Sequence, residues 1–145
     1  MSANSRFTVA IHILAWMALV ERKGTVTITS DRLAASVNTN PVVIRRALGL
    51  LRGAGLVNVQ HGAGAGWTLA RPADQISLLS VHDAVEPEPM FSMHSAEPNQ
   101  ACPVGRGIQP ALSRVYQRVD DALRRELATT SISDVLAQTL AARRT

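Results

Sequence analysis

The sequence predicts a mainly α-helical protein with one small β-hairpin and a long C-terminal helix. Apolar residues recur at helical spacing over several stretches, the longest of which covers residues 108–127. Residues 56–60 and 67–70 instead read as two short strands on either side of the glycine-rich segment 62–66, which is typical of a hairpin. The chain has 145 residues and only 3% aromatic residues, so it has the size of one domain and must build its core from aliphatic side chains.

The first predicted helix covers residues 5–22 and is apolar on nearly all sides. Such a helix must be covered by several neighbours or by another subunit. The stretch is too short to cross a bilayer and ends in the charged residues Glu21, Arg22 and Lys23, so we predict a buried helix and neither a membrane span nor a signal peptide. His12 lies in this apolar pattern, which favours a buried, hydrogen-bonded ring.

Two further helices follow a short β-like segment at residues 26–28. Thr29 and Ser30 are good N-cap residues for a helix over residues 31–36. After a turn at residues 38–40, the next helix begins at Asn40 and Pro41, because proline at the first helical position lacks only an N–H that has no partner there.

The third helix has two different faces. Its apolar residues Ile44, Ala47, Leu48 and Leu51 recur at helical spacing, and Val42, Arg45, Arg46 and Gly49 lie on the other side. One face is therefore expected to pack, and the other is available to a partner.

The order of helix, helix, tight turn, helix and hairpin predicts a winged helix-turn-helix with a long C-terminal dimerisation helix. In this fold the helix after the turn enters the major groove of DNA, and the hairpin, or wing, reaches the neighbouring minor groove. Thr39 and Asn40 can meet phosphates or base edges, Arg45 and Arg46 supply guanidinium groups, and His61 lies at the base of the wing. We therefore predict double-stranded DNA as the partner.

The distribution of charge supports this prediction. Residues 1–71 contain eight basic and two acidic residues, whereas residues 72–145 contain seven basic and nine acidic residues. A basic first half indicates contact with a polyanion. The alternative is a winged-helix protein–protein interaction module without DNA binding, since arginines on a helix are often only a solvated face.

The helix predicted over residues 108–127 carries more apolar surface than a small domain can cover. Dimerisation through this helix is the simplest explanation, and a two-fold dimer would read a roughly palindromic site. We predict three regions: a DNA-binding domain over residues 1–86, an irregular linker or sensor loop over residues 87–107, and the dimerisation and C-terminal helices over residues 108–145. The expected interface residues are Ile108, Leu112, Tyr116, Val119, Leu123 and Leu127.

Other classes of site are not predicted. No Ser/His/Asp grouping or pair of carboxylates stands out, so we expect no catalytic residues and no enzyme. The glycines of segment 62–66 lack the spacing of a nucleotide-binding loop. Cys102 is the only cysteine, so no disulfide within the chain and no metal site is expected, and a reducing, cytoplasmic location fits best.

Three blocks of sequence resemble the Rrf2 family of bacterial transcription regulators. They are the runs 40–57 (NPVVIRRALGLLRGAGLV), 64–72 (GAGWTLARP) and 76–86 (ISLLSVHDAVE), and the run 102–105 (CPVG) before the long helix is also similar. The resemblance implies a homodimeric winged-helix regulator, usually a repressor. Carried over by position, it implies that the residues facing DNA are Arg6, Ser30, Thr39, Asn40, Pro41, Val42, Arg45, Arg46, His61, Gly62, Gly64 and Gly66.

The best-known members of that family hold an iron–sulfur cluster through three cysteines in the loop before the long helix. Cys102 stands alone in this loop, and a single cysteine cannot supply three thiolates, so we expect no iron–sulfur cluster and no cofactor. Two readings of Cys102 remain open: a thiol that senses redox state, and a small buried hydrophobic residue. A small-molecule effector, for which Met90, Phe91 and Met93 could line a pocket, or a partner protein are further sources of a signal.

Overall fold

The structure of the protein, a computed structural model, describes residues 3–24 and 27–142. The chain forms two compact units. The first combines the residues up to Pro87 with the residues from Leu127 onward, and the second is Glu88–Glu126. Among the described residues, no helix has both the length and the apolarity that a membrane crossing requires.

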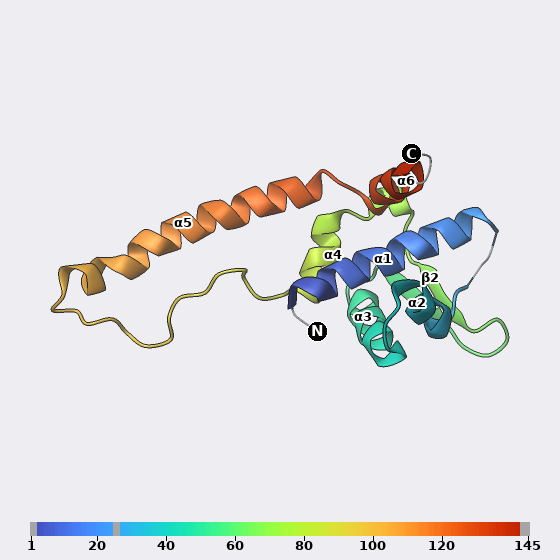
Figure 1. Ribbon diagram of the computed structural model, residues 1–145, viewed down its shortest axis with the longest axis horizontal. Coiled ribbons are helices and arrows are strands. Elements are labelled where there is room, and N and C mark those ends of the chain that lie inside the picture. The colour runs from blue at the N-terminus through green and yellow to red at the C-terminus, as the bar shows by residue number, and fades with distance from the viewer. Residues whose placement is uncertain (1–2, 25–26, 143–145) are drawn as a thin grey trace. The chain divides into compact units, whose positions relative to one another are not determined.

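The first unit is built around helix α1 (Ala3–Arg22). Helices α2 (Ser30–Val37) and α3 (Pro41–Gly53) pack on one side of α1, and α6 (Ile132–Ala142) packs on the other (Figure 1). Helix α4 (Leu78–Val85) contacts both α1 and α3, and a short 3-10 turn, η1 (Ala73–Gln75), precedes it. The cover that α1 requires is thus supplied by several neighbours in its own chain.

The hairpin pairs strand β1 (Val57–Gln60) with strand β2 (Gly66–Leu69) in antiparallel register, with Val59 opposite Trp67. Ile28 adds an isolated bridge on the other side of Trp67: its N–H donates to the Trp67 carbonyl at 3.1 Å, and the Trp67 N–H donates back at 2.8 Å. Residue 28 of the predicted β-like segment therefore pairs as expected, whereas residue 26 lies outside the described residues.

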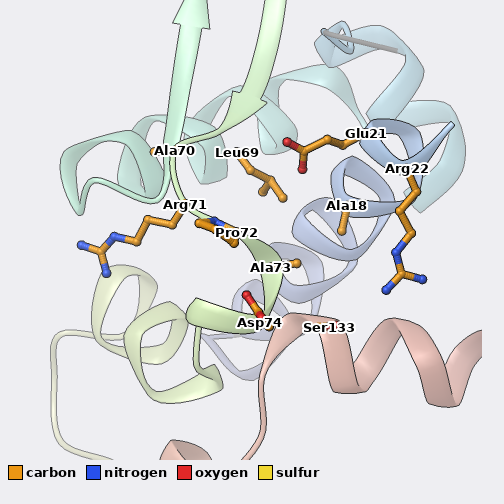
Figure 2. A pocket seen from close by; sticks show the side chains of 10 residues that line it. All are labelled: Ala18, Glu21, Arg22, Leu69, Ala70, Arg71, Pro72, Ala73, Asp74 and Ser133. Carbon is orange, nitrogen blue, oxygen red and sulfur yellow. The ribbon is translucent and has the colours of Figure 1, made fainter. Parts of the chain in front are cut away.

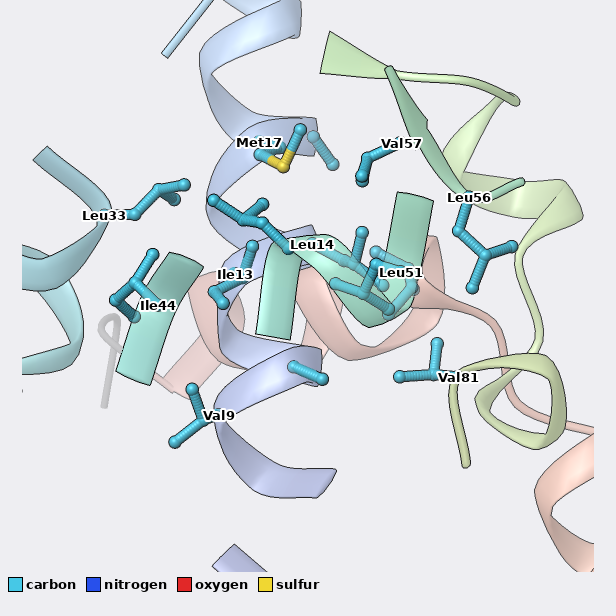
Figure 3. Packing of buried hydrophobic residues seen from close by; sticks show 14 of the residues in the cluster. Val9, Ile13, Leu14, Met17, Leu33, Ile44, Leu51, Leu56, Val57 and Val81 are labelled. Atoms are coloured by element: carbon cyan, nitrogen blue, oxygen red, sulfur yellow. The ribbon is translucent and has the colours of Figure 1, made fainter. Parts of the chain in front are cut away.

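The described residues of the first unit share one aliphatic core (Figure 3). It draws side chains from α1, α2, α3, α4 and the hairpin, as the composition predicts. Ile132 and Leu136 of α6 belong to the same core. The C-terminal helix, which the sequence grouped with the predicted dimerisation helix, thus packs in the first unit with the predicted DNA-binding domain. The core residues that are 0–1% exposed include Ile13, Leu14, Leu33, Ile44, Leu48, Leu51, Leu56, Val57, Ile76, Val81 and Ile132.

The second unit contains an extended segment followed by most of helix α5 (Pro103–Ala128). The helix begins at Pro103 and not at residue 108, because the Cys102 carbonyl already accepts the Arg106 N–H at 2.9 Å and proline fits the first helical position. Pro110 consequently lies inside the helix and not in its first turn. The linker before α5 is therefore shorter than the predicted residues 87–107, because the helix begins at Pro103.

His12 differs from its prediction. Its ring is hydrogen-bonded, with Nε2 at 2.9 Å from Ser36 Oγ, but the residue is exposed. The expectation of a buried ring was wrong because residue 12 lies on the edge of α1 that faces α2, outside the core.

Candidate nucleic-acid interface

Helix α3 is positioned by signals in its own sequence. Asn40 is its N-cap: the side-chain Oδ1 accepts the Val42 N–H at 2.8 Å, and Pro41 is the first helical residue. Besides this bond, the exposed Asn40 side chain has two amide N–H donors to offer a partner. The N-cap also leaves the positive end of the helix dipole at this exposed end of α3, where it favours a phosphate.

The faces of α3 are divided as the sequence predicts. Ile44, Leu48 and Leu51 are 0% exposed in the core. Val42, Arg45 and Arg46 are exposed on the opposite side. Among residues 3–24 and 27–142, no ion pair occupies Arg45 or Arg46. The guanidinium groups are therefore available to an anionic partner.

The turn between α2 and α3 is tight. Asn38 adopts a left-handed backbone conformation with φ of 62°, and the Thr39 N–H donates to the Ala34 carbonyl at 3.1 Å. Ser30, at the start of α2, and Thr39 are both half-buried. Thr29 and not Ser30 caps α2, because its Oγ1 accepts the Arg32 N–H at 3.3 Å.

The tip of the wing is held by one contact from outside the hairpin and one from strand β1. Gly62 and Gly64 take the positive φ values of 80° and 70° that its turns need. The Gly64 carbonyl accepts a hydrogen bond from Thr27 Oγ1 at 2.9 Å, and the Ala63 carbonyl accepts one from Gln60 Nε2 at 3.2 Å. His61 is exposed. The tip is thus a shaped loop that presents His61 and Gly62 outward.

Gly66 departs from the prediction that it faces DNA. The residue is buried, and a Cβ atom there would lie 2.8 Å from the Ile28 carbonyl oxygen. Gly66 therefore permits the close approach of residue 28 to the hairpin and cannot lie on the outer surface of the wing.

Arg6 is not free in the structure. Its Nε and Nη2 donate to the two carboxylate oxygens of Glu86, each at 3.3 Å. The carboxylate is 15% exposed and partly neutralises the Arg6 charge, so Arg6 is a weaker candidate for DNA contact than Arg45 or Arg46. Neither Thr27 nor Glu86 was found by sequence reasoning, because each contacts a residue far along the chain and leaves no local pattern.

Helix α5, most of which lies in the second unit, has no buried residue among its described residues 103–128. Val104, Ile108, Val115 and Val119 are between 36% and 67% exposed. Tyr116 stacks on Phe91 with ring centroids 5.3 Å apart, and Met90 is 60% exposed. Ile108 and Val119, two of the six expected interface residues, thus lie on an exposed apolar stripe along α5, whereas the other four are half-buried: Leu112, Tyr116, Leu123 and Leu127.

Cys102 is exposed at the start of α5. Its N–H donates to the Asn99 carbonyl at 3.2 Å, and its carbonyl accepts the Arg106 N–H. The reading of Cys102 as a small buried hydrophobic residue is therefore wrong.

Comparison with known proteins identifies the family. The model of the Rrf2 family, described as iron-dependent transcriptional regulators, matches residues 3–138. This chain belongs to the Rrf2 family. It is a transcriptional regulator and not an enzyme.

The Rrf2 assignment agrees with individual relatives. The chain is 42% identical over 134 residues to the HTH-type transcriptional regulator YwnA of Bacillus subtilis, covering 92% of this chain and 96% of YwnA. A crystal structure of a DNA-binding protein superposes with a TM-score of 0.72 at 39% identity, covering 90% of this chain and 98% of that chain. The winged-helix regulator CymR of Staphylococcus aureus superposes with a TM-score of 0.67 at 25% identity, covering 91% and 95% of the two chains.

The residues of this Rrf2 member do not fit an iron–sulfur cluster. Cys102 is the only thiol in the sequence, and such clusters are held mainly by several thiolates. Among the described residues, no group of three His, Cys, Asp or Glu side chains could hold a metal ion. The donor set therefore disagrees with the iron dependence in the family's description.

Proposed function

We propose that the chain is a cytoplasmic, homodimeric repressor that binds a roughly palindromic site on double-stranded DNA and works without an iron–sulfur cluster. The observation that carries the proposal is the division of α3, which buries Ile44 and Leu48 and leaves Arg45 and Arg46 exposed with no ionic partner among the described residues. An exposed pair of guanidinium groups beside an N-capped helix start suits the major groove.

Each candidate contact has a chemical role. The guanidinium groups of Arg45 and Arg46 can bind guanine edges or phosphates in a bidentate manner. The Asn40 amide can donate to an acceptor, and the exposed Val42 side chain suits a thymine methyl group. We assign positioning contacts to phosphates to the hydroxyl groups of Ser30 and Thr39, and only a van der Waals contact to Pro41, which has no N–H. Minor-groove contacts are assigned to the wing tip at His61, Gly62 and Gly64.

The dimer is proposed from the apolar stripe of α5. Exposed aliphatic residues such as Ile108, Val115 and Val119 recur on one face of the helix, and covering them with the same face of a second copy satisfies a two-fold contact. A two-fold dimer places two recognition helices about 34 Å apart, which is one turn of DNA. A dimer bound across a promoter would block access to it, which accounts for repression.

The signal that switches the regulator is proposed to be read by Cys102 or by a bound effector. The exposed thiol is accessible to oxidants, and its place at the first turn of α5 connects its oxidation to the helix that forms the dimer. DNA binding measured with peroxide and with a thiol reductant, for wild type and Cys102→Ser, tests this. A redox response in the wild type alone supports the switch, and equal responses in both proteins refute it.

The DNA contacts are tested by fluorescence anisotropy with a duplex from the protein's own upstream region. Arg45→Ala should weaken specific binding by about 1 to 3 kcal/mol if the side chain reads a base edge, and should lower the salt dependence if it contacts a phosphate. Arg22→Ala removes the same charge from the far end of α1 and is the matched control. Equal affinities for wild type and Arg45→Ala remove Arg45 from the interface.

The alternative function is a winged-helix interaction module without DNA binding. Binding to a duplex of random sequence at low salt distinguishes it from a DNA-binding regulator. A basic DNA reader binds such a duplex with a steep dependence on salt concentration, whereas an interaction module does not bind it.

The proposed lack of an iron–sulfur cluster is tested on anaerobically purified protein. We expect no iron signal and no visible absorbance, and stoichiometric iron would refute the proposal that the protein works without a cluster.

A further inference from the structure

A cavity of about 260 Å³ lies between α1, α3 and α4 in the first unit, and we call it the α1–α3 cavity. Its walls are aliphatic and come from three helices: Val9, Val43, Ala47, Leu50 and Val85. Its polar groups are the side chains of Arg6 and Arg46. None of the contacts proposed for DNA requires an apolar cavity at this place.

The charge of the α1–α3 cavity is positive. Arg6 is balanced by Glu86, whose two carboxylate oxygens accept from Arg6 at 3.3 Å. Arg46 has no ion pair among the described residues. The guanidinium of Arg46 thus lies beside an aliphatic wall without a carboxylate partner in the part of the chain that the structure describes. Arg6 also has N–H groups that do not donate to Glu86. This combination matches a ligand that has one anionic end and one apolar end.

The size of the cavity limits the ligand. Pockets for drug-sized molecules span about 300–1,000 Å³, so the α1–α3 cavity suits a smaller molecule. A single ring or a short branched chain fits the aliphatic wall, and a carboxylate matches the planar fork of a guanidinium.

A larger hollow of about 550 Å³ offers a contrast. It lies where the end of α1, the segment after β2 and the start of α6 meet (Figure 2). Arg22 and Arg71 on its rim point to opposite sides, and Glu21 and Asp74 add negative charge. Its cations do not converge, so the second hollow is a poorer anion site than the α1–α3 cavity.

We propose that the α1–α3 cavity is an effector site for a small hydrophobic monocarboxylate, whose carboxylate binds Arg46 and whose apolar body contacts Ala47 and Leu50. This inference rests on the proposed DNA-binding function, because Arg46 is also a proposed DNA contact. A ligand that holds the Arg46 guanidinium withdraws it from DNA. By thermodynamic linkage, the carboxylate weakens DNA binding by the same factor by which DNA weakens carboxylate binding.

The cavity is tested without DNA by titrating the purified full chain with benzoate and with 3-methylbutanoate while methyl NMR signals are followed. We expect saturable shifts of the Val43, Ala47 and Leu50 methyl groups. Benzamide, which has the same ring without the charge, should bind at least tenfold more weakly. Absence of saturable shifts with both carboxylates overturns the proposal, and equal binding of benzamide overturns the role of the cations.

Variants of the cavity residues test which side chains contact benzoate. Arg46→Gln should weaken benzoate binding about tenfold, equivalent to about 1.4 kcal/mol, whereas Arg52→Gln, the same change elsewhere on α3, should alter it less than twofold. Ala47→Leu should abolish binding by filling the cavity. Leu50→Ala should weaken binding without risk to folding, because Leu50 is 45% exposed. Benzoate affinities that are unchanged in all three cavity variants place the ligand elsewhere and refute the site.

The effect on DNA is measured separately, by anisotropy with and without saturating benzoate. We expect benzoate to lower DNA affinity at least threefold in the wild type and to have no effect in Ala47→Leu. DNA binding without any benzoate binding refutes the effector site alone. Benzoate binding by a protein that binds no DNA refutes the proposed function and leaves the binding site standing.

Discussion

The close contact between Gly66 and Ile28 makes a sharp prediction about stability. Gly66 has a φ of 153°, a conformation that residues with a Cβ atom rarely adopt, and a Cβ there would lie 2.8 Å from the Ile28 carbonyl oxygen and 3.0 Å from Thr27 Cβ. In Gly66→Ala, the backbone strain costs about 1 to 3 kcal/mol. Relief of the clash separates Ile28 from Trp67 and loses two hydrogen bonds worth about 0.5–1.5 kcal/mol each. The total destabilisation is therefore about 2 to 6 kcal/mol.

The matched control is Gly49→Ala, the same chemical change in the middle of α3. Nothing lies within 4 Å of a Cβ atom there, and the residue is exposed. Because alanine favours a helix interior over glycine, this variant should be stabilised by about 0.5–1 kcal/mol. The same substitution thus has opposite signs at the two positions.

The assay is urea unfolding followed by circular dichroism at one fixed protein concentration, since dimerisation would make stability depend on concentration. Native-state hydrogen exchange of the Trp67 amide, which donates to the Ile28 carbonyl, reports local opening of the wing. A Gly66→Ala protein with the wild-type unfolding midpoint and wild-type protection at Trp67 would refute the reasoning.

Three further predictions concern the core, the wing and helix α5. Leu48→Ala should lower the free energy of unfolding by about 2–5 kcal/mol, because Leu48 is 0% exposed in the core; a smaller loss of free energy in urea unfolding would show that the site collapses around the smaller side chain. Thr27→Val removes the donor to the Gly64 carbonyl and should weaken specific DNA binding while changing stability by only about 0.5–1.5 kcal/mol, as measured by anisotropy and urea unfolding; unchanged DNA binding would show that the wing tip needs no such contact. Val119→Asp places a charge on the apolar stripe of α5 and should yield a monomer by sedimentation equilibrium, whereas Ser113→Asp on another face of the helix should not; a Val119→Asp dimer would exclude this stripe as the interface.

Signals within one turn of helix explain why much of the fold was predicted correctly. The Asn40 cap and Pro41 begin α3 where expected. A local signal of the same kind begins α6 in the structure: the Ser131 N–H donates to Asp134 Oδ2 at 2.9 Å, and the Asp134 N–H donates to Ser131 Oγ at 3.1 Å. The predicted start of α5 at residue 108 is too late, because Pro103 already occupies the first helical position.

The candidate site was predicted only in part. Helical spacing places Arg45 and Arg46 opposite Ile44 and Leu48, because that relation depends on the geometry of one helix. The prediction for Gly66 failed because a glycine-rich segment indicates a loop but does not say which glycine another strand approaches. Exposure of Cys102 was also undecided, since burial depends on what the rest of the chain places nearby.

The sequence by itself therefore determined the order of the elements, the two faces of α3 and the apolar stripe of α5. These features depend on helical and strand periodicity and on caps, which act over a few residues. Only the tertiary structure decided that Thr27 holds the wing tip, that Glu86 partly neutralises Arg6, that α6 joins the core of the first unit, and that α1, α3 and α4 enclose a cavity. The partners in those contacts are far apart along the chain, so they are set by how whole elements pack and leave no pattern in the local sequence.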